Sequence, residues 1–489
     1  MKAQAKLLGY APDIDPTTPG IFVNCAAIVP TLKGFKAAPS PIAMSLPALA
    51  AICQGAVVAR KLDNTTRFLA ATGTKIYEDA TTSWTDRTRV SGGDYAAASD
   101  VRWSFAQFND ITLAAIKSDT LQYSSSGAFA NVTGAPKATI VETVNEFVFL
   151  FDTNEAIYGD SPNRWWCAAQ GNYTDWTPSV STNCYTGTLL SSPGKIRAAK
   201  KFGDSIVVYK DRAMYIGYFA GSPVGWKFSQ IPGESGALSN EVVVKVELAE
   251  SPMHIFMGYS DFYAFDGSRP IPIGANIIKH TVFSELNRQY AHCSIALHDY
   301  DEDVIYFFYP TSSAKPDKCV VYNYRTRQWG RDDRTIEAAV EYIAAGSTYD
   351  GLGSSYSTYD DLPSASHDTA FAYSGSPLDV IFDANHTPKT LTGAAGNSSI
   401  TLGDFGQDSD FTLLQRVKLR FITAPTSSTM VNYYRNNLSD ALTMDATTSM
   451  SSGRYDVLRE ARWHRMRLDF VGDTEFSDVI IDAEISGSE

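Results

Sequence analysis

The stretch Gly258-Tyr-Ser-Asp-Phe-Tyr-Ala-Phe-Asp-Gly-Ser-Arg-Pro-Ile-Pro-Ile-Gly274 decides the fold class. An apolar strand at 254–258 reaches a turn at Ser260-Asp261 and returns as Phe262-Tyr-Ala-Phe265. Asp266-Gly267 then predicts a second tight turn, because this residue pair tolerates the backbone angles of a two-residue hairpin. The stretch is therefore predicted to form two antiparallel strands.

After this hairpin the apolar spacing changes to that of a helix. Ile278, Val282 and Leu286 fall on one face between residues 276 and 291. Asn276 is the expected N-cap, because its side chain can accept a hydrogen bond from a free N–H group of the first turn. One helix near 276–291 is thus predicted to interrupt a series of strand pairs.

The strand pair recurs, and an aromatic residue in its second strand aligns the copies into six units. The aligned residues are Tyr77, Tyr123, Tyr158, Tyr215, Tyr263 and Tyr322. A tryptophan follows seven positions later in three units, at Trp84, Trp165 and Trp329. The intervals of 46, 35, 57, 48 and 59 residues suit a four-stranded blade. An all-β fold containing a β-propeller of about six blades is predicted, and an irregular β protein with similar hairpins is the alternative.

Composition and charge narrow the class of protein. The chain has 489 residues and 44% hydrophobic content, enough for two or three domains with cores. Its formal net charge is -13 with only 19% charged residues, which argues against gripping nucleic acid along a basic face. This charge does not exclude a protein that lets nucleic acid pass.

The cysteines and the longest apolar stretch indicate neither a disulfide scaffold nor a membrane span. No C-x-x-C pair or zinc-like spacing occurs, so reduced and mostly buried thiols are expected. The six cysteines are Cys25, Cys53, Cys167, Cys184, Cys293 and Cys319. Pro41–Ala59 holds Pro47, Gln54 and Gly55 and is predicted to be a buried strand leading into the first blade. No secretory signal is expected.

Three regions are predicted along the chain. Residues 1–60 form an extended N-terminal arm and a strand leading into the first blade, because their apolar residues are too few to form a core alone. Residues 61–375 form the propeller and residues 376–489 a C-terminal β domain of sandwich type, which the arm could complete. Gly346–His367 has the lowest complexity and is expected to be a loop suited to a tip or a binding surface.

The C-terminal region contains at least five predicted strands. They are 414–422, 430–434, 454–458, 464–470 and 479–485. In the fourth strand, period-two alternation places Arg465, Arg467 and Asp469 on one face, opposite apolar residues on the other. The arginines therefore indicate a solvated or interfacial face rather than a phosphate-binding cluster.

Catalytic and metal-binding motifs are weak throughout the sequence. The seven histidines are scattered, and no P-loop, G-x-S-x-G or H-E-x-x-H motif occurs. The densest acidic cluster lies near His292 and His298 and consists of Asp299, Asp301, Glu302 and Asp303. A metal or general-acid site is conceivable there, but a hairpin turn explains the same residues. No catalytic, cofactor-binding or metal-binding residue is assigned, and the protein is expected not to be an enzyme.

A loop at 161–189 concentrates aromatic residues. Trp165, Trp166, Tyr173 and Trp176 could bind a sugar or a partner if exposed, or they could pack over a blade. The S-x-D-x-G-x-T-W box that sialidase-type propellers repeat is absent from the sequence. The case for a glycan-cleaving enzyme therefore loses its best support.

The order of these features resembles the tail nozzle proteins of short-tailed bacteriophages, also called packaged-DNA stabilisation or head-closure tail proteins. The resemblance covers most of the chain through short motifs: Phe22-Val-Asn with Pro30-Thr and Gly34-Phe, Arg67–Tyr77, Ser161–Trp176, the Tyr263 strand pair with its helix, Tyr322 with Trp329, Arg465–Phe470 and Val479–Ile485. The family offers no catalytic motif to match.

The resemblance implies a structural virion protein that forms a ring, a hexamer in that family, below the portal and adaptor. Such a ring prolongs the DNA channel, retains the packaged genome and lets it out on infection. Expected neighbours are the adaptor and portal rings, tailspike or fibre and tail plug proteins, and passing double-stranded DNA bound weakly and without sequence preference. The implied location is the virion tail, after assembly in the host cytoplasm. The alternative is a glycan-binding or glycan-cleaving β-propeller, such as a receptor-binding tail protein or a lectin.

Overall fold

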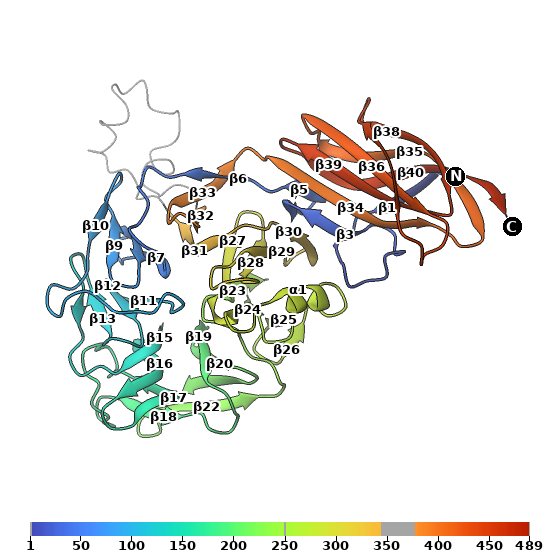
Figure 1. Cartoon of the computed structure of the whole chain (residues 1–489). Helices are drawn as coiled ribbons and strands as arrows, with labels where there is room; N and C mark the ends of the chain where they lie inside the picture. The colour runs from blue at the N-terminus through green and yellow to red at the C-terminus, as the bar shows by residue number, and fades with distance from the viewer. Residues whose placement is uncertain (1, 249–250, 344–376, 489) are drawn as a thin grey trace.

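The computed structural model describes residues 2–248, 251–343 and 377–488. Strands dominate this part of the chain, which contains one α-helix, α1 (Lys279–Glu285), and a 3-10 turn at 291–293. Figure 1 shows a ring of small sheets beside a second β part that holds both chain ends. The predicted all-β class is confirmed. The predicted loop Gly346–His367 lies outside the described residues.

Within the described chain, seven groups of four antiparallel strands stand around a common centre. The first strands of successive groups contact one another in order, and the last of them, β31 (Ile336–Tyr342), contacts the first, β7 (Gly55–Arg60), so that the ring closes. This arrangement is β-propeller-like. About six blades were predicted from the sequence, and the described chain has seven such groups.

The first six groups follow one another in chain order, with α1 between the fifth and the sixth. The first three are β7, β8 (Thr66–Ala71), β9 (Ile76–Asp79) and β10 (Trp84–Asp86); β11 (Ser104–Phe108), β12 (Ile111–Ala115), β13 (Gln122–Ser124) and β14 (Ala130–Asn131); and β15 (Lys137–Val144), β16 (Phe147–Glu155), β17 (Gly159–Cys167) and β18 (Tyr185–Thr188). The next three are β19 (Ile196–Phe202), β20 (Ser205–Lys210), β21 (Met214–Phe219) and β22 (Trp226–Ile231); β23 (Val243–Leu248), β24 (Ser251–Met257), β25 (Phe262–Phe265) and β26 (Pro270–Pro272); and β27 (Ile295–Asp299), β28 (Val304–Tyr309), β29 (Lys318–Asn323) and β30 (Gln328–Arg331).

The second strand of a blade is often apolar at consecutive positions rather than at alternate ones. In β16 the first seven residues are buried, and in β28 all six are. Both faces of these strands are covered, because a neighbouring blade packs on each side; Phe149 of β16, for example, meets Trp226 of the next blade at 4.8 Å between ring centres. These consecutive apolar residues therefore form the walls between blades.

One of the six aligned units is out of register. Tyr158 lies in the turn between β16 and β17 rather than in a strand, and the seven-residue offset from Tyr158 to Trp165 is therefore a coincidence. Tyr77 and Tyr322, in contrast, lie in third strands, and Trp84 and Trp329 lie in the fourth strands that follow them. The offset has structural meaning only in those two units.

The seventh group combines distant parts of the chain. It consists of β31, β32 (Leu378–Asp383), β33 (Pro388–Gly393) and, on its outer edge, β6 (Ser40–Ala43) of the arm. The pairing of β33 with β6 includes Thr390↔Ile42. The ring thus takes strands from both regions that the sequence analysis placed outside it, 1–60 and 376–489, and the boundary predicted at 375 falls inside one sheet.

A buried carboxylate links the seventh group to its neighbours. The side chain of Glu337 in β31 is fully buried and accepts hydrogen bonds from the backbone N–H of Cys53 at 3.0 Å and from Nδ1 of His386 at 2.8 Å. It also pairs with Nζ of Lys315 at 2.7 Å. A buried charge persists only with such compensation, so these contacts help to hold the ring closed.

Replacement of the buried carboxylate tests its role in closing the ring. Glu337→Gln removes the charge opposite Lys315 and is expected to lower the free energy of unfolding by about 3 kcal/mol, the usual cost of breaking a buried ion pair. Urea unfolding followed by tryptophan fluorescence measures this change. Asp86→Asn is the control: its exposed pair with Lys75 should contribute under about 1 kcal/mol. Equal losses for both variants would contradict this role.

The second part of the molecule is two sheets packed face to face, called the sandwich below. One sheet has the order β2 (Gly9–Tyr10), β3 (Ile21–Ala26), β34 (Asn397–Gly406), β39 (Trp463–Val471), β36 (Ser427–Arg435) and β37 (Thr443–Ser449). The other has the order β4 (Ile28–Pro30), β5 (Phe35–Ala37), β40 (Glu475–Ser488), β35 (Asp410–Thr423) and β38 (Arg454–Ala461), and β1 (Lys2–Lys6) also pairs with β40. All five predicted C-terminal strands lie within these elements.

Aromatic side chains from both sheets form the centre of the sandwich. Phe22 and Phe35 come from the arm and lie 4.8 Å apart between ring centres, while Phe470 and Phe476 lie 5.3 Å apart. The arm therefore supplies strands and core residues to the sandwich. The second sheet also continues into the sixth blade through the pairing of β4 with β30 at Ile28↔Arg331.

The arm also determines where the helix begins. Asp13 accepts hydrogen bonds from the backbone N–H groups of His280 and Thr281 and from the Thr281 hydroxyl. The predicted cap, Asn276, instead has a positive φ of 61° and lies before the helix. The predicted apolar face is present, with Ile278, Val282 and Leu286 buried. The capping carboxylate comes from a remote segment, which local sequence rules do not anticipate.

Candidate functional site

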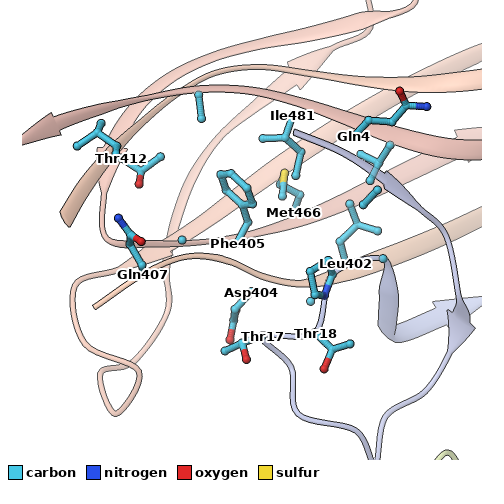
Figure 2. Close-up of a pocket in the computed structure, with 18 of the residues that line it drawn as sticks. Gln4, Thr17, Thr18, Leu402, Asp404, Phe405, Gln407, Thr412, Met466 and Ile481 are labelled. Atoms are coloured by element: carbon cyan, nitrogen blue, oxygen red, sulfur yellow. The ribbon is translucent and has the colours of Figure 1, made fainter. Parts of the chain in front are cut away.

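A large cavity lies between the two sheets of the sandwich, with the arm at one side. Its volume is about 580 Å³, within the range of ligand-binding pockets. Figure 2 shows Phe405 reaching into it from β34 toward Met466 and Ile481, with Thr17 and Thr18 at one side. Its other principal lining residues are Gln4, Ala5, Leu402, Gln407, Thr412, Val479, Ala483, Glu484 and Ile485.

Small residues create this space. Gly403 lets the arm approach β34 closely, since a side chain there would meet the carbonyl oxygen of Pro16. Gly406 has a φ of 141° and lies against the backbone of Arg462. Ala5 of β1 faces the cavity with a single methyl group. The arm thus forms one wall of the cavity without filling it.

The size of the cavity excludes a dry, sealed void. At about 24 cal/mol per Å³, an enclosed empty space of 580 Å³ would cost roughly 14 kcal/mol, as much as the whole stability of a typical domain. The space must therefore be open to water or occupied. Because its walls are mostly apolar side chains, it is better suited to an apolar occupant than to water.

At the polar side of the cavity, one buried carboxylate is paired with two arginines. The Asp404 side chain is fully buried and accepts two hydrogen bonds from Arg465, at 2.8 Å from Nε and 2.8 Å from Nη2. Nη2 of Arg435 lies 2.6 Å from the same carboxylate. Of the arginine face predicted in 464–470, Arg465 is thus engaged within the fold, whereas Arg467 pairs with Asp469 on the exposed surface.

The buried pairs of Asp404 and the exposed pair of Arg467 are expected to contribute different amounts to the free energy of unfolding. Asp404→Asn leaves Arg435 and Arg465 without their anion and is expected to cost about 3 kcal/mol. Arg467→Ala removes an exposed pair of the same strand and should cost under about 1 kcal/mol. Thermal unfolding by circular dichroism measures both. A loss of stability for Arg467→Ala as large as that for Asp404→Asn would show that the buried pairs contribute no more to stability than the exposed one.

The acidic cluster at 299–303 forms a hairpin turn between β27 and β28. Asp299 accepts hydrogen bonds from the backbone N–H groups of Asp301 and Glu302, each at 3.0 Å. Asp303 accepts one from the Tyr324 hydroxyl at 2.8 Å. Among the described residues, no group of three or more His, Cys, Asp or Glu side chains is arranged to hold a metal ion. Asp299 therefore fixes the backbone of the turn, and Asp303 holds the neighbouring Tyr324 side chain.

The two histidines near this cluster lie in different surroundings. His298 is buried, and Nε2 of its ring lies 3.3 Å from the Tyr324 hydroxyl. Nε2 of His292 lies 3.1 Å from the carbonyl oxygen of Asp100, in another part of the ring. Burial lowers the pKa of His298 to about 4. The structure thus does not bring the two histidines together.

The aromatic loop is packed over its blades. Trp165, Trp166 and Trp176 are buried, and Tyr173 contacts Tyr123 with 5.4 Å between ring centres. The six cysteines are also buried and free. Neither set forms an exposed chemical site in the described chain.

Buried neutral histidines predict sensitivity to acid. Burial lowers the pKa of His254 to about 3, while its ring hydrogen-bonds the Tyr209 hydroxyl at 2.7 Å and the Lys201 carbonyl at 3.0 Å. The unfolded chain binds a proton near pH 6.5 and the folded chain does not, so stability is lost as pH falls from 6.5 toward 3. By pH 5, His254 alone should account for about 2 kcal/mol.

The pH dependence is measured with urea titrations at pH 7.5 and pH 5. His254→Gln is the matched variant: it should be less stable than the parent at pH 7.5, yet lose about 2 kcal/mol less on acidification. An identical loss in both proteins would show that His254 is not the group responsible.

No protein-family model matches the chain, and no curated protein matches it. Solved structures similar to it include YCF48 bound to D1 peptide, at 9% identity and a TM-score of 0.38, covering 75% of this chain and 98% of that one. The extracellular domain of a putative hybrid two-component system from B. thetaiotaomicron gives 8% identity and a TM-score of 0.37, covering 85% and 47%. An exo-beta-1,3-galactanase from Phanerochaete chrysosporium with galactose gives 9% and 0.28, covering 91% and 100%. Such low likeness carries no argument about function.

Proposed function

We propose that this chain is a non-catalytic structural subunit of a short-tailed bacteriophage tail. Copies of it form a ring, six in the family that the sequence resembles, below the portal and adaptor. The ring prolongs the DNA channel, retains the packaged genome and releases it on infection. The partners in this proposal are the neighbouring copies, the adaptor and portal, and tailspike or fibre and plug proteins.

The observation that carries the proposal is the continuity between the propeller-like ring and the sandwich. Backbone pairing runs from β30 to β4, from β4 to β5 and from β5 to β40, so one sheet extends across both parts. Two domains joined by a linker would be expected to move relative to one another. A subunit without such freedom suits a wall that contains DNA under load.

The net charge of the chain is consistent with passive passage of DNA. The chain carries a formal charge of -13. The stretch 195–201 holds four basic residues among seven, and one of them, Arg197, is paired to Asp211 at 2.5 Å. A wall that neutralised many phosphates would bind DNA tightly and slow its exit. The absence of turnover is part of the same proposal, because Asp299 and Asp303 of the acidic turn accept structural hydrogen bonds.

Particle imaging is the direct test. Electron cryo-microscopy of virions containing this chain is expected to show it as a ring between the adaptor and the distal tail. Isolated protein should remain monomeric by light scattering, since the portal and adaptor would act as the template. A lone peripheral fibre in the particles would overturn the ring.

Duplex DNA binding provides a second test. Binding at physiological salt should be no tighter than the roughly 10⁻⁴ to 10⁻⁶ M of non-specific proteins. A gel-shift titration that gave nanomolar, sequence-selective affinity would rule out a passive channel.

A glycan-binding protein is the second candidate. The sandwich cavity, with hydroxyl and amide groups at Thr17, Thr18 and Gln407 beside Phe405, offers the mixture of apolar and polar groups that sugars require. The burial of Trp165, Trp166 and Trp176 removes the loop platform first considered for this role. Binding of a glycan on an array, lost when Phe405→Ala is tested, would favour this candidate.

A further inference from the structure

A second pocket lies between the sixth and seventh groups of the ring and has a volume of about 220 Å³. Five carboxylates line it and define what is called the acidic pocket below: Asp299, Asp301 and Glu302 of the turn between β27 and β28, Glu341 of β31 and Asp379 of β32. The register of the seventh group places Glu341 directly opposite Asp379. Like charges at opposite positions of two antiparallel strands are destabilising, so the pocket calls for a compensating charge.

The lining residues supply little of that charge. Lys36 is the one lysine or arginine among the described residues that line the pocket, and its Nζ already pairs with Glu302 at 2.7 Å. Within the described chain, the carboxylates of Asp301, Glu341 and Asp379 form no hydrogen bond and no ion pair. Three of the five carboxylates therefore lack a partner there.

Neighbouring parts of the chain do not supply the charge either. Of the described lysines, Lys200 and Lys245 line an adjoining pocket with Glu341, but neither is ion-paired with it, and Lys245 pairs with Glu142 at 3.4 Å. Residues 344–376, which lie outside the described part, contain no lysine or arginine. They contain one histidine, a residue type that is ordinarily uncharged at about pH 8.

The uncompensated charge is also reflected in the carboxyl groups themselves. Burial, and then the nearby Asp301 and Asp299, raise the pKa of Glu341. Burial, and then the nearby carboxylates, raise the pKa of Asp379 well above its usual range. A bound cation would favour the ionised forms of both groups.

Unpartnered acceptors near the carboxylates are an independent indication of a ligand. Tyr306 is 2% exposed and lines the pocket, yet its hydroxyl forms no hydrogen bond within the described chain. His298 also lines the pocket, and its buried Nδ1 has no partner among the described residues. The Tyr324 hydroxyl donates to Asp303 and so accepts from Nε2 of His298, which leaves Nδ1 as a bare acceptor. Buried polar groups are normally hydrogen-bonded, so the pocket offers acceptors without a donor.

We propose that the acidic pocket binds a small organic cation with more than one ammonium group, such as a short diamine or a polyamine. The ammonium groups would pair with the carboxylates of Asp301, Glu341 and Asp379. The Tyr306 hydroxyl would accept a hydrogen bond from one of them. Such a ligand supplies both things that the pocket lacks, positive charge and N–H donors.

A metal ion suits the same residues less well. Among the described residues, no group of three or more His, Cys, Asp or Glu side chains is arranged to hold one. The carboxylates come from separate strands around the pocket, so a ligand with separated charges matches them better than a single point charge. The rings of Tyr300 and Tyr306 also line the pocket, and an aromatic face can cover an ammonium group or the methylene groups next to it.

The acidic pocket goes beyond the proposed function and does not depend on it. It lies within one copy of the chain, so a ring subunit, a fibre or a glycan-binding protein could each contain it. The test therefore uses the isolated full chain, and its result does not change with the presence or absence of a ring in particles.

Isothermal titration calorimetry of the full chain with putrescine, at about pH 8, measures the binding. Butylamine is the matched ligand, because it has the same carbon chain with a single ammonium group. Putrescine is expected to bind about tenfold more tightly than butylamine, since it pairs with carboxylates at both ends. Glu341→Gln combined with Asp379→Asn should weaken putrescine binding by about tenfold or more, and Glu341→Gln alone should change it in the same direction.

A remote carboxylate and the stability of the variants serve as controls. Asp204→Asn removes an exposed carboxylate from the turn between β19 and β20 and should leave binding unchanged. The double variant should melt no lower than the parent without ligand, because it removes two opposed like charges. No binding of putrescine, equal binding of putrescine and butylamine, an equal loss for Asp204→Asn, or displacement of putrescine by an equal concentration of Mg²⁺ would overturn the proposal.

Discussion

The arm must pair in two places before either part of the molecule is complete. Its strands β3 and β5 belong to the two sheets of the sandwich, and β6 closes the seventh group of the ring. Because these strands are consecutive along the chain, the sandwich and the ring are connected at their edges. The interactions of Asp13 with the helix and of Glu337 with its three partners strengthen the same connections.

Much of the fold was predictable from the sequence. Local patterns identified the central hairpin at 254–265, the repeated strand pairs and the five C-terminal strands, because each depends on residues close together in the chain. The seventh group was missed because β6 and β33 are separated by more than three hundred residues, and neither has an aromatic anchor. Tyr158 was misplaced because a turn aromatic resembles a strand aromatic when only spacing is considered.

The candidate site was much less accessible to sequence reasoning. Its cavity is defined by what is small, at Ala5, Gly403, Gly406 and Ala483, and these residues are contributed by three strands from opposite ends of the chain. The tryptophans at 161–189 and the clustered carboxylates at 299–303 gave stronger sequence signals, yet the structure uses them for packing and for a turn. Ile485 was an available signal, since it continues the apolar alternation of Val479, Ile481 and Ala483 in one strand.

Native-state hydrogen exchange across the arm tests the central claim most directly. If β6 is an obligatory part of the ring, the hydrogen-bonded amides of β6 and β33 should exchange only through global unfolding, with the same free energy as those of β3 and β5. Exchange of β6 through a low-energy local opening, while β31 and β7 stay protected, would contradict the account, because the ring would then stand closed without the arm.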